Sequence, residues 1–440
     1  MQSKTTTNRK IIILGAGIGG LYVAGELGKK GYSVVVYEKK LRHELGYPWA
    51  DSVSKDTFKN VGITLPEDSY ISKQVLNFYS PSGYGYIKQA QRASKNLDVD
   101  RKKLIDFLIN LAENYCEINF GVVADNLITY NDRVIGVSVN GKAKYCDLVI
   151  DSTGVFSPYR KQISSKFLMD DELLPHDYLM AYRGYYRKID DTPAPPNVYL
   201  MPDGFSVLWC KDADDTALSD IFVSDFTSLD NNQIDAAFEY IRARNPYITS
   251  ERVTYAQDAI PVRYPLATIV ADGYAVIGNA AFMAKPTSGS GIENTLTAAA
   301  ILTDIIKKAN DFTASALWQY AVRVNLAFGA NSYMTYIARS RFQVLDREDL
   351  IWLFDSGVLN DSLLALARFD LKNQDDFQIR NILGSVGLAR KKPELVRQIG
   401  SILRKCARAR ILAMKMPILY DEALIKAWKT EYDSYARSDE

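Results

Sequence analysis

The sequence predicts an α/β protein made of a nucleotide-binding domain, an antiparallel-sheet domain interleaved with it, and an α-helical C-terminal region. A glycine-rich turn between two apolar strand patterns near the N-terminus predicts the first part. Aromatic-rich strand patterns between residues 178 and 226 predict the second, and helical periodicity from about residue 292 predicts the third. Because 440 residues are many for a single core, we expect two or three domains.

The N-terminal turn has the pattern of a dinucleotide-binding motif. Residues 11–14 are an apolar run typical of a buried parallel strand, and residues 15–20 read Gly-Ala-Gly-Ile-Gly-Gly before a helical pattern. Gly15 permits the tight turn, Gly17 lets the backbone approach a pyrophosphate, and Gly20 lets helix and strand pack closely. The helix N-terminus adds N–H groups and partial positive charge for phosphates.

An acidic residue completes this motif. A second strand runs from Ser33 to Tyr37, and Glu38 ends it, 18 residues after Gly20. A carboxylate at this point can accept both ribose hydroxyls and would repel a 2′-phosphate, which disfavours NADP. Lys39 and Lys40 follow, either as a solvated charge run or close to the adenosine. Together the strand, turn, helix and acid predict a bound dinucleotide.

The next hundred residues predict a helix and several short strands. A helix is expected from Asp100, with apolar residues on one face. Asn140-Gly141 is a hairpin signal between two strands. The expected strands cover residues 116–123, 126–130, 133–139 and, as one buried strand, 144–150.

Longer strand patterns follow and predict an antiparallel sheet able to carry a substrate pocket. They cover residues 179–186, 198–201, 206–210 and 221–223, and a helix is expected at 231–243. Aromatic side chains recur in them, and these are either strand core or the wall of an aromatic pocket. They are Tyr182, Tyr185, Tyr186 and Trp209.

A second glycine-rich segment follows a strand ending near residue 277. It contains Gly278-Asn279-Ala-Ala and then residues 286–292, Pro-Thr-Ser-Gly-Ser-Gly-Ile, before a helix from about Glu293. A helix N-terminus of this kind suits a diphosphate or an oxyanion. Two such segments in one chain favour a long cofactor with two ends.

The C-terminal tail predicts basic amphipathic helices. Arginines and lysines from Arg390 to Arg410 alternate with leucines and isoleucines. Such helices either cap the nucleotide-binding domain or lie on an anionic membrane surface. The expected domains are 8–175 with 255–330 for the cofactor, 176–254 for the antiparallel sheet, and 331–440 for the helical region.

Composition and charge argue against several classes of protein. The formal net charge of +1 offers no electrostatic basis for nucleic acid as the main partner. No run of eighteen apolar residues is present, and residues 1–10 lack the apolar core of a signal peptide. The four cysteines are scattered and the chain has two histidines, which argues against a disulfide framework and a metal site. We therefore expect a cytoplasmic protein with reduced thiols.

Several motifs in order give the chain a family resemblance. The N-terminal fingerprint, Val99-Asp100-Arg101, Asp151-Ser-Thr-Gly154 and the late glycine segment resemble the FAD-dependent enzymes of the para-hydroxybenzoate hydroxylase fold. Within that fold the chain resembles the geranylgeranyl reductase family, over roughly residues 10–330.

The resemblance implies FAD, held without a covalent bond, and assigns residues to it. The turn would hold the pyrophosphate, Glu38 and Lys39 the adenosine side, and the late segment the ribityl chain and isoalloxazine. The implied cofactor-binding residues are Gly15, Ala16, Gly17, Ile18, Gly19, Gly20, Glu38, Lys39, Arg101, Val123, Gly154, Gly278, Asn279, Gly289, Ser290, Gly291 and Ile292.

Two positions depart from the family pattern. The family's aspartate in the late motif is Asn279 here, which adds an amide donor. Gly204 to Cys210 stand where the family has Tyr-x-Trp-x-Phe-Pro. The substrate pocket is predicted around Tyr47, Pro48, Trp49, Tyr185, Phe205 and Trp209. No catalytic residue is assigned.

The resemblance implies an FAD-dependent oxidoreductase that reduces C=C bonds of a long, apolar, geranylgeranyl-type isoprenoid by hydride transfer from reduced flavin. NAD(P)H or a ferredoxin-like protein would supply the electrons, with peripheral membrane contact as an option. Two other functions stay open. One is an FAD-dependent monooxygenase of the same fold. The other is a non-catalytic prenyl-binding escort protein, against which Glu38 argues because a ribose-binding carboxylate has no purpose without a nucleotide.

Overall fold

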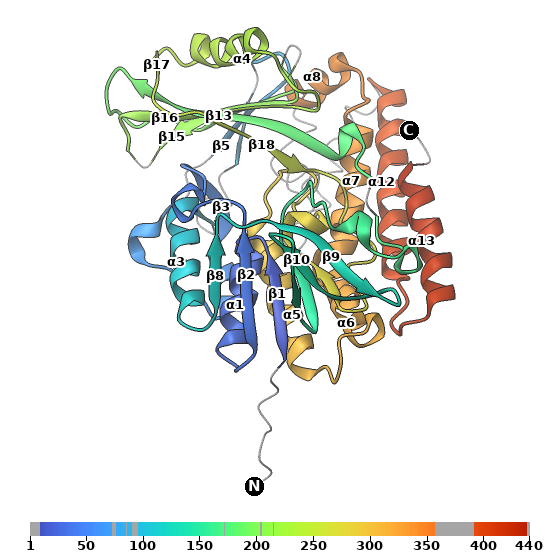
Figure 1. The fold of residues 1–440 in the computed structure, drawn as a ribbon. Coiled ribbons are helices and arrows are strands. Elements are labelled where there is room, and N and C mark those ends of the chain that lie inside the picture. The colour runs from blue at the N-terminus through green and yellow to red at the C-terminus, as the bar shows by residue number, and fades with distance from the viewer. Residues whose placement is uncertain are drawn as a thin grey trace.

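The computed structural model describes residues 9–72, 76–84, 86–89, 96–170, 172–202, 205–213, 215–356 and 391–437. Figure 1 shows two stacked parts, with a mostly parallel sheet below, an antiparallel sheet above, and C-terminal helices along one side. Gly204 and Arg390, which figured in the predictions, lie outside the described residues. No helix among the described residues is both long and apolar enough to cross a membrane.

The lower part is a six-stranded sheet in the order β19-β20-β12-β1-β2-β8. Its inner strands pair in parallel, as uniformly apolar runs such as Ile11–Leu14 do when helices cover the sheet. The strands are β1 (Lys10–Leu14), β2 (Ser33–Glu38), β8 (Glu117–Phe120), β12 (Leu148–Asp151), β19 (Val270–Ala271) and β20 (Tyr274–Val276). Hence the carboxyl ends of β1, β2 and β12 meet at one edge, where a nucleotide-binding turn is expected.

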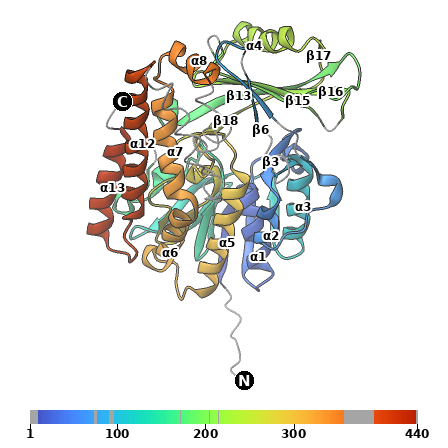
Figure 2. The ribbon, with the colours of Figure 1, turned by 180° about the vertical axis from the view of Figure 1, so that it is seen from behind.

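Helices α1 (Ile18–Gly28) and α5 (Ile292–Lys308) lie side by side against this sheet (Figure 2). Their contact is close because Gly19 has no side chain, and a Cβ there would lie 2.8 Å from Thr295 Cγ2. Helix α3 (Arg101–Glu113) packs on α1, and Asp100 caps it by accepting a hydrogen bond from the Lys103 N–H at 2.9 Å.

One strand prediction is wrong. Residues 144–150 form parts of two strands, the exposed β11 (Lys142–Tyr145) and the buried β12. The polar Lys-Ala-Lys-Tyr run pairs antiparallel with β10 (Arg133–Val139) at the surface, next to β9 (Ala124–Tyr130). Only the apolar Leu-Val-Ile-Asp run enters the parallel sheet, because burial on both faces requires apolar residues without alternation.

The upper part is an eight-stranded sheet in the order β17-β13-β16-β15-β14-β5-β6, with β18 also paired to β13. Helix α4 (Asn231–Arg244) covers one face with Ile234, Phe238 and Ile241. The strands are β5 (Leu76–Tyr79), β6 (Tyr86–Gln89), β13 (Tyr178–Lys188), β14 (Asn197–Leu200), β15 (Val207–Asp212), β16 (Leu218–Asp225), β17 (Ile248–Arg252) and β18 (Ala256–Pro261). The sheet thus takes three strands, β5, β6 and β18, from outside residues 176–254.

Smaller elements connect the two parts. A three-stranded sheet of β3 (Ala50–Ser54), β7 (Asn96–Asp100) and β4 (Tyr70–Ser72) lies beside α2 (Asp56–Asn60). The short 3-10 helices cover Arg42–Glu44, Glu67–Ser69, Arg160–Gln162, Ser165–Phe167, Pro175–Asp177 and Gly278–Ala281.

The C-terminal region is helical. After α6 (Ala314–Val324), a π-helical turn (Asn325–Gly329) leads into α7 (Ala330–Phe342), and α8 (Arg347–Asp355) follows. Helix α12 (Pro393–Met414) runs along α7, with α13 (Glu422–Arg437) beside it (Figure 1). Tyr333 stacks on Tyr432 at 3.9 Å, and Trp318 Nε1 donates to the Pro417 carbonyl at 2.8 Å.

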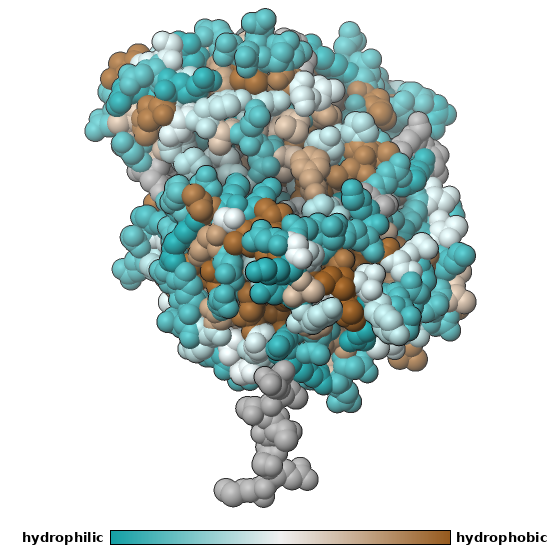
Figure 3. All heavy atoms as spheres, in the orientation of Figure 1, coloured by the Kyte–Doolittle hydropathy of each residue, from teal (hydrophilic) through white to brown (hydrophobic). Residues whose placement is uncertain are grey.

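The surface of the molecule is mostly hydrophilic, and the tail helices bury one apolar face. Hydrophilic residues cover most of the face shown in Figure 3, while hydrophobic residues gather in the lower part of the molecule. On the tail helices, Leu395, Ile402, Leu412 and Trp428 are buried, so one face of the predicted amphipathic helices is used for packing. Membrane contact by the opposite face stays a prediction.

Candidate functional site

A single cavity of about 1620 Å³ lies between the two sheets. Its volume exceeds the roughly 300–1,000 Å³ usual for one small ligand, so it has room for a cofactor and a second molecule. Sixteen of the seventeen predicted cofactor residues line it, although they come from segments spread from residue 15 to residue 292. Gly20 is the exception. It lies beneath the turn, where a Cβ would come within 2.7 Å of the Gly15 carbonyl oxygen.

The first glycine turn is shaped by contacts that no larger residue would allow. Gly15 has φ +88°, and a Cβ there would lie 2.6 Å from the Ser152 carbonyl oxygen. A Cβ on Gly17 would lie 3.0 Å from Ser152 Oγ. Gly17 is also the N-cap of α1, and no side chain caps this helix. The first-turn N–H groups of α1 therefore open onto the cavity and suit a phosphate.

Glu38 lies at the end of β2 beside this turn. It is 6% exposed, and its two carboxylate oxygens accept hydrogen bonds from the N–H of Ala16 at 2.7 Å and of Lys40 at 2.8 Å. A carboxylate can accept about four hydrogen bonds, so capacity for a ribose hydroxyl pair is left. Lys39 and Val123 are exposed on the adjacent cavity wall.

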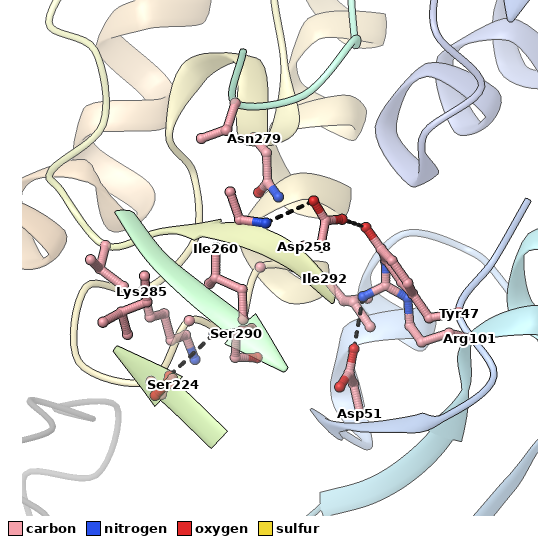
Figure 4. Close-up of a pocket in the computed structure, with 18 of the residues that line it drawn as sticks. Tyr47, Asp51, Arg101, Ser224, Asp258, Ile260, Asn279, Lys285, Ser290 and Ile292 are labelled. Carbon is pink, nitrogen blue, oxygen red and sulfur yellow. Dashed lines mark hydrogen bonds and ion pairs between the residues drawn. The ribbon is translucent and has the colours of Figure 1, made fainter. Parts of the chain in front are cut away.

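The late glycine segment forms a second cradle, next to the first on the same side of the cavity. Gly278 and Gly289 have φ of +68° and +66°, and a Cβ on Gly289 would lie 2.6 Å from Ile260 Cγ2. Gly291 is the N-cap of α5, again with no capping side chain. Asn279 is exposed on the cavity wall (Figure 4). Two uncapped helix N-termini thus face one cavity, an arrangement that fits a long cofactor with a central diphosphate.

Arg101 begins α3 and is held in place by the loop before β3. It forms an ion pair with Asp51 at 2.8 Å and lies 5.2 Å from the centre of the Tyr47 ring. Burial alone would raise the pKa of Asp51, but the charges of Arg101 and Arg183 hold it below its usual value. Arg101 Nε has no hydrogen-bond partner.

The loop at residues 46–49 presents a pair of groups that can hold a proton. Tyr47 stacks on Trp49, with ring centres 4.5 Å apart, and its hydroxyl donates to the Asp258 carboxylate (Figure 4). Asp258 Oδ1 also accepts the Ala259 N–H at 2.8 Å. Burial raises the pKa of Asp258 above its usual value. Both side chains line the cavity close to the late glycine segment.

A buried ion pair crosses the upper wall. Arg183 lies between the rings of Trp49 and Trp209, 4.7 Å from each centre, and donates through Nε to Asp220 at 2.8 Å. It also donates to Asp51 at 3.1 Å. Burial would lower the pKa of Arg183, but Asp220 and Asp51 raise it above the usual value. This network fixes the aromatic rings that border the cavity.

The structure brings half of the six predicted substrate residues to the cavity. Tyr47, Trp49 and Trp209 line the cavity, whereas Pro48, Tyr185 and Phe205 are not among the described residues that do. Phe205 instead packs with the α4 side of the sheet.

Tyr182 and Tyr186 also pack on that side, under Phe238. Their prediction as an aromatic channel wall is therefore wrong, and the strand-core alternative is confirmed. Successive side chains of a strand point to opposite faces, and only the odd-numbered residues of β13 face the cavity.

The apolar part of the cavity was missed by reasoning from the sequence. Its walls come from β5, β14, β15 and β16 and from helices α7 and α8, which are far apart in the chain. The apolar lining includes Phe78, Val198, Leu200, Val207, Phe222, Phe342, Leu350, Leu353 and Phe354.

Charged residues of the cavity wall, among them Asp51, Arg183, Asp258 and Arg339, were also missed. A charge inside an apolar strand, as at Arg183, was the available signal. Among the described residues, no cluster of three or more His, Cys, Asp and Glu side chains could hold a metal ion.

Comparisons with known proteins agree with this architecture. Residues 13–59 match the model of the NAD(P)-binding Rossmann-like domain. A digeranylgeranylglycerophospholipid reductase of Sulfolobus acidocaldarius is 22% identical, with 96% of each chain covered. The solved structure of a geranylgeranyl bacteriochlorophyll reductase-like protein from Thermoplasma acidophilum has a TM-score of 0.72 at 18% identity, covering 90% of this chain and 99% of that one.

A second solved structure carries the alternative activity in its description. It is a probable FAD-dependent monooxygenase from Pseudomonas aeruginosa, with a TM-score of 0.60 at 17% identity, covering 79% of this chain and 99% of that one. The fold is therefore shared by reductases and monooxygenases. Because the similarity in sequence extends over almost the whole chain, the predicted resemblance to the geranylgeranyl reductases is confirmed, and the chain has the fold of these flavin-dependent oxidoreductases.

Proposed function

We propose that this protein is an FAD-dependent oxidoreductase that reduces C=C bonds of a long, apolar isoprenoid lipid. One observation carries the proposal. A single cavity joins two uncapped, glycine-rich helix N-termini to a long wall of apolar side chains. The similarity to reductases over almost the full length favours reduction over the other chemistries of the fold.

The residues present fit FAD. The α1 turn has the open N–H groups and the close backbone approach that a diphosphate needs, and Glu38 excludes a 2′-phosphate from the ribose site. The α5 turn with Gly289 to Ile292 would lie beside the isoalloxazine, and Asn279 would hydrogen-bond the ribityl chain. Bound there, FAD supplies a hydride acceptor and donor. NAD(P)H or a ferredoxin-like protein would deliver the electrons.

The apolar wall suits a hydrocarbon chain. Phe78, Val198, Leu200 and Phe222 extend from the polar centre toward α7 and α8. Each buried CH₂ group stabilises binding by about 0.8 kcal/mol, so a twenty-carbon chain needs few polar contacts. The rigid pair of Trp49 and Trp209, held by Arg183, would fix the position of the reacting double bond.

Reduction of a C=C bond also needs a proton at the second carbon. The Tyr47 hydroxyl, which donates to the half-buried Asp258 carboxyl, holds a proton on the cavity wall near the late glycine segment. We assign Tyr47 as the proton donor and Asp258 as the group that replenishes it. The stacking of Tyr47 on Trp49 orients the hydroxyl without further polar contacts.

The test separates reduction from oxygenation. The chromophore is released by heat and identified, and the flavin of the intact protein is then reduced under nitrogen and mixed with geranylgeraniol. Reoxidation without oxygen, with formation of the saturated alcohol, supports the proposal. Substrate-dependent oxygen consumption with no anaerobic reoxidation would establish the monooxygenase instead, as the fold of the Pseudomonas protein allows. A colourless protein unable to bind FAD would contradict both.

We further propose that the protein works at a membrane surface, where its substrate resides. At the end of α12 and before α13, Ile418 and Leu419 are 68% and 78% exposed, and Ile411 is 61% exposed. Arg410 and Lys415 are exposed in the same segment. Exposed apolar side chains next to cations favour an anionic bilayer.

A further inference from the structure

The cavity wall includes an arginine in an unusual setting. Arg339 projects from α7, near the apolar Phe342 and Phe354. Its guanidinium carbon lies 5.1 Å from the centre of the Phe226 ring and 5.4 Å from that of Tyr336. Nη2 donates to the His176 carbonyl over a long 3.4 Å, and Nε and Nη1 are buried without a hydrogen-bond partner. No carboxylate forms an ion pair with it in the described part of the chain.

Three other buried arginines in the described part of the chain have stronger polar partners, although Nε of Arg160 and of Arg263 also lacks a hydrogen bond. Arg183 pairs with Asp220, and Arg263 pairs with Asp170 and Asp177 at 3.4 and 3.5 Å. Arg160 donates to the carbonyls of Ala280 and Val155 at 2.5 and 3.0 Å.

Arg339 differs because its only hydrogen bond is long, two of its nitrogens have no partner, and no described carboxylate pairs with it. Burial lowers its pKa to about 10, and the nearby Tyr336 and Asp177 offset this only in part. A buried charge without a counter-ion is costly. It is explained if an anionic ligand supplies the partner.

We infer that Arg339 binds the phosphate head group of the isoprenoid substrate, in the same cavity that the two glycine cradles line. The inference rests on the proposed function. The apolar wall from Phe78 and Phe222 to Phe354 leads from the reacting centre to this guanidinium, so one amphiphile can occupy both. Phosphate oxygens accept charge-assisted hydrogen bonds from guanidinium N–H groups, which would satisfy Nε and Nη1. The head group would then lie inside the cavity and not on the basic tail helices.

The test compares two lipids that differ only in the phosphate. Dissociation constants of geranylgeranyl phosphate and geranylgeraniol are measured with the oxidised, FAD-loaded protein, without turnover. The wild type should prefer the phosphate by about 10- to 100-fold, the range of a charge-assisted hydrogen-bond pair. Arg339→Met should abolish this preference by weakening phosphate binding, with geranylgeraniol unchanged, and Arg339→Lys should retain part of it. Arg187→Met, which removes an exposed arginine paired with Glu251, serves as the matched control and should behave as the wild type.

The unfolding temperature of Arg339→Met separates a binding role of Arg339 from a structural role, because a structural role would lower this temperature. Arg339→Met should unfold at the same or a higher temperature than the wild type in the absence of lipid, because it removes an uncompensated buried charge. A strongly destabilised variant that keeps the phosphate preference would overturn the inference.

Competition by inorganic phosphate, at the concentrations where the lipid phosphate binds, would also overturn the inference, since the site would then serve a free anion. If the wild type binds both lipids equally, the inference alone fails. If it binds neither, the proposed lipid substrate fails with it.

Discussion

The two walls of the cavity recognise their ligands by opposite means. The lower wall works through its main chain. At Gly15, Gly17 and Gly289 the missing side chains let the two turns pack closely on Ser152 and Ile260, and the N-termini of α1 and α5 that follow have no side-chain cap. The upper wall works through side chains, with Arg183 clamped between two tryptophans and tied to Asp220. The lower wall depends on glycines, which have no side chains, and the upper wall depends on charged and aromatic side chains that must lie in contact with one another.

This difference predicts different responses to substitution. Adding atoms to the lower wall should block the cofactor while the fold survives. Removing one partner from the upper wall should weaken the fold itself, because a charge is left buried.

The largest effect is expected at the glycine turn. Gly15→Ala would place a Cβ 2.6 Å from the Ser152 carbonyl oxygen at φ +88°, so we expect the purified protein to lose its bound flavin and all activity. Gly31→Ala is the matched control, since Gly31 has φ +89° but open space around it. It should keep its flavin, measured by absorbance per protein. Equal flavin loss in both variants would show that the positive φ, and not the contact of a Cβ with Ser152, explains the loss.

A loss of stability is expected in the upper wall. Asp220→Asn leaves the Arg183 guanidinium without its buried counter-charge, and we expect unfolding to become easier by about 3 kcal/mol, at the lower end for a broken buried pair because Asp51 remains. Urea titration measures this value. Glu251→Gln, which breaks the exposed pair with Arg187, should cost no more than about 1 kcal/mol. Similar values for the two variants would refute the comparison.

A smaller effect, confined to the chemical step, is expected at Tyr47. Tyr47→Phe removes the proposed proton donor and should slow anaerobic, substrate-dependent flavin reoxidation by about 100-fold, the lower range for general acid catalysis. Flavin content and substrate affinity should stay unchanged. Tyr185→Phe, in β13 and not among the described cavity-lining residues, should leave the rate intact. An unaltered rate in Tyr47→Phe would remove this residue from the mechanism.

The smallest effect is expected at the surface. Replacing Ile418 and Leu419 by serine should weaken association with anionic liposomes by about threefold to tenfold without lowering the unfolding temperature, because both side chains are exposed. Replacing the equally exposed Ile189 by serine is the control, and it should leave liposome association unchanged if the effect is specific to the tail helices. Unchanged co-sedimentation of the Ile418 and Leu419 variant would leave the tail helices as a structural cap.

The prediction from sequence was strongest where structure is local. The β1 strand, the turn at Gly15, helix α1 and Glu38 lie within thirty residues, so spacing alone carries their relation. The alternation of side chains also predicted the antiparallel sheet. It could not say which face of β13 meets the cavity, and Tyr182 and Tyr186 therefore fell on the α4 side.

The nucleotide-binding motif can be recognised from local sequence, because glycine spacing and a terminal carboxylate act through backbone geometry over a short stretch of chain. The rest of the cavity depends on contacts between segments that are distant in the chain. The partners of Arg183, Asp220 and Asp51, are 37 and 132 residues away, and Tyr47 meets Asp258 across 211 residues. Such pairs depend on strand register and on the packing of distant segments, and no local pattern encodes either.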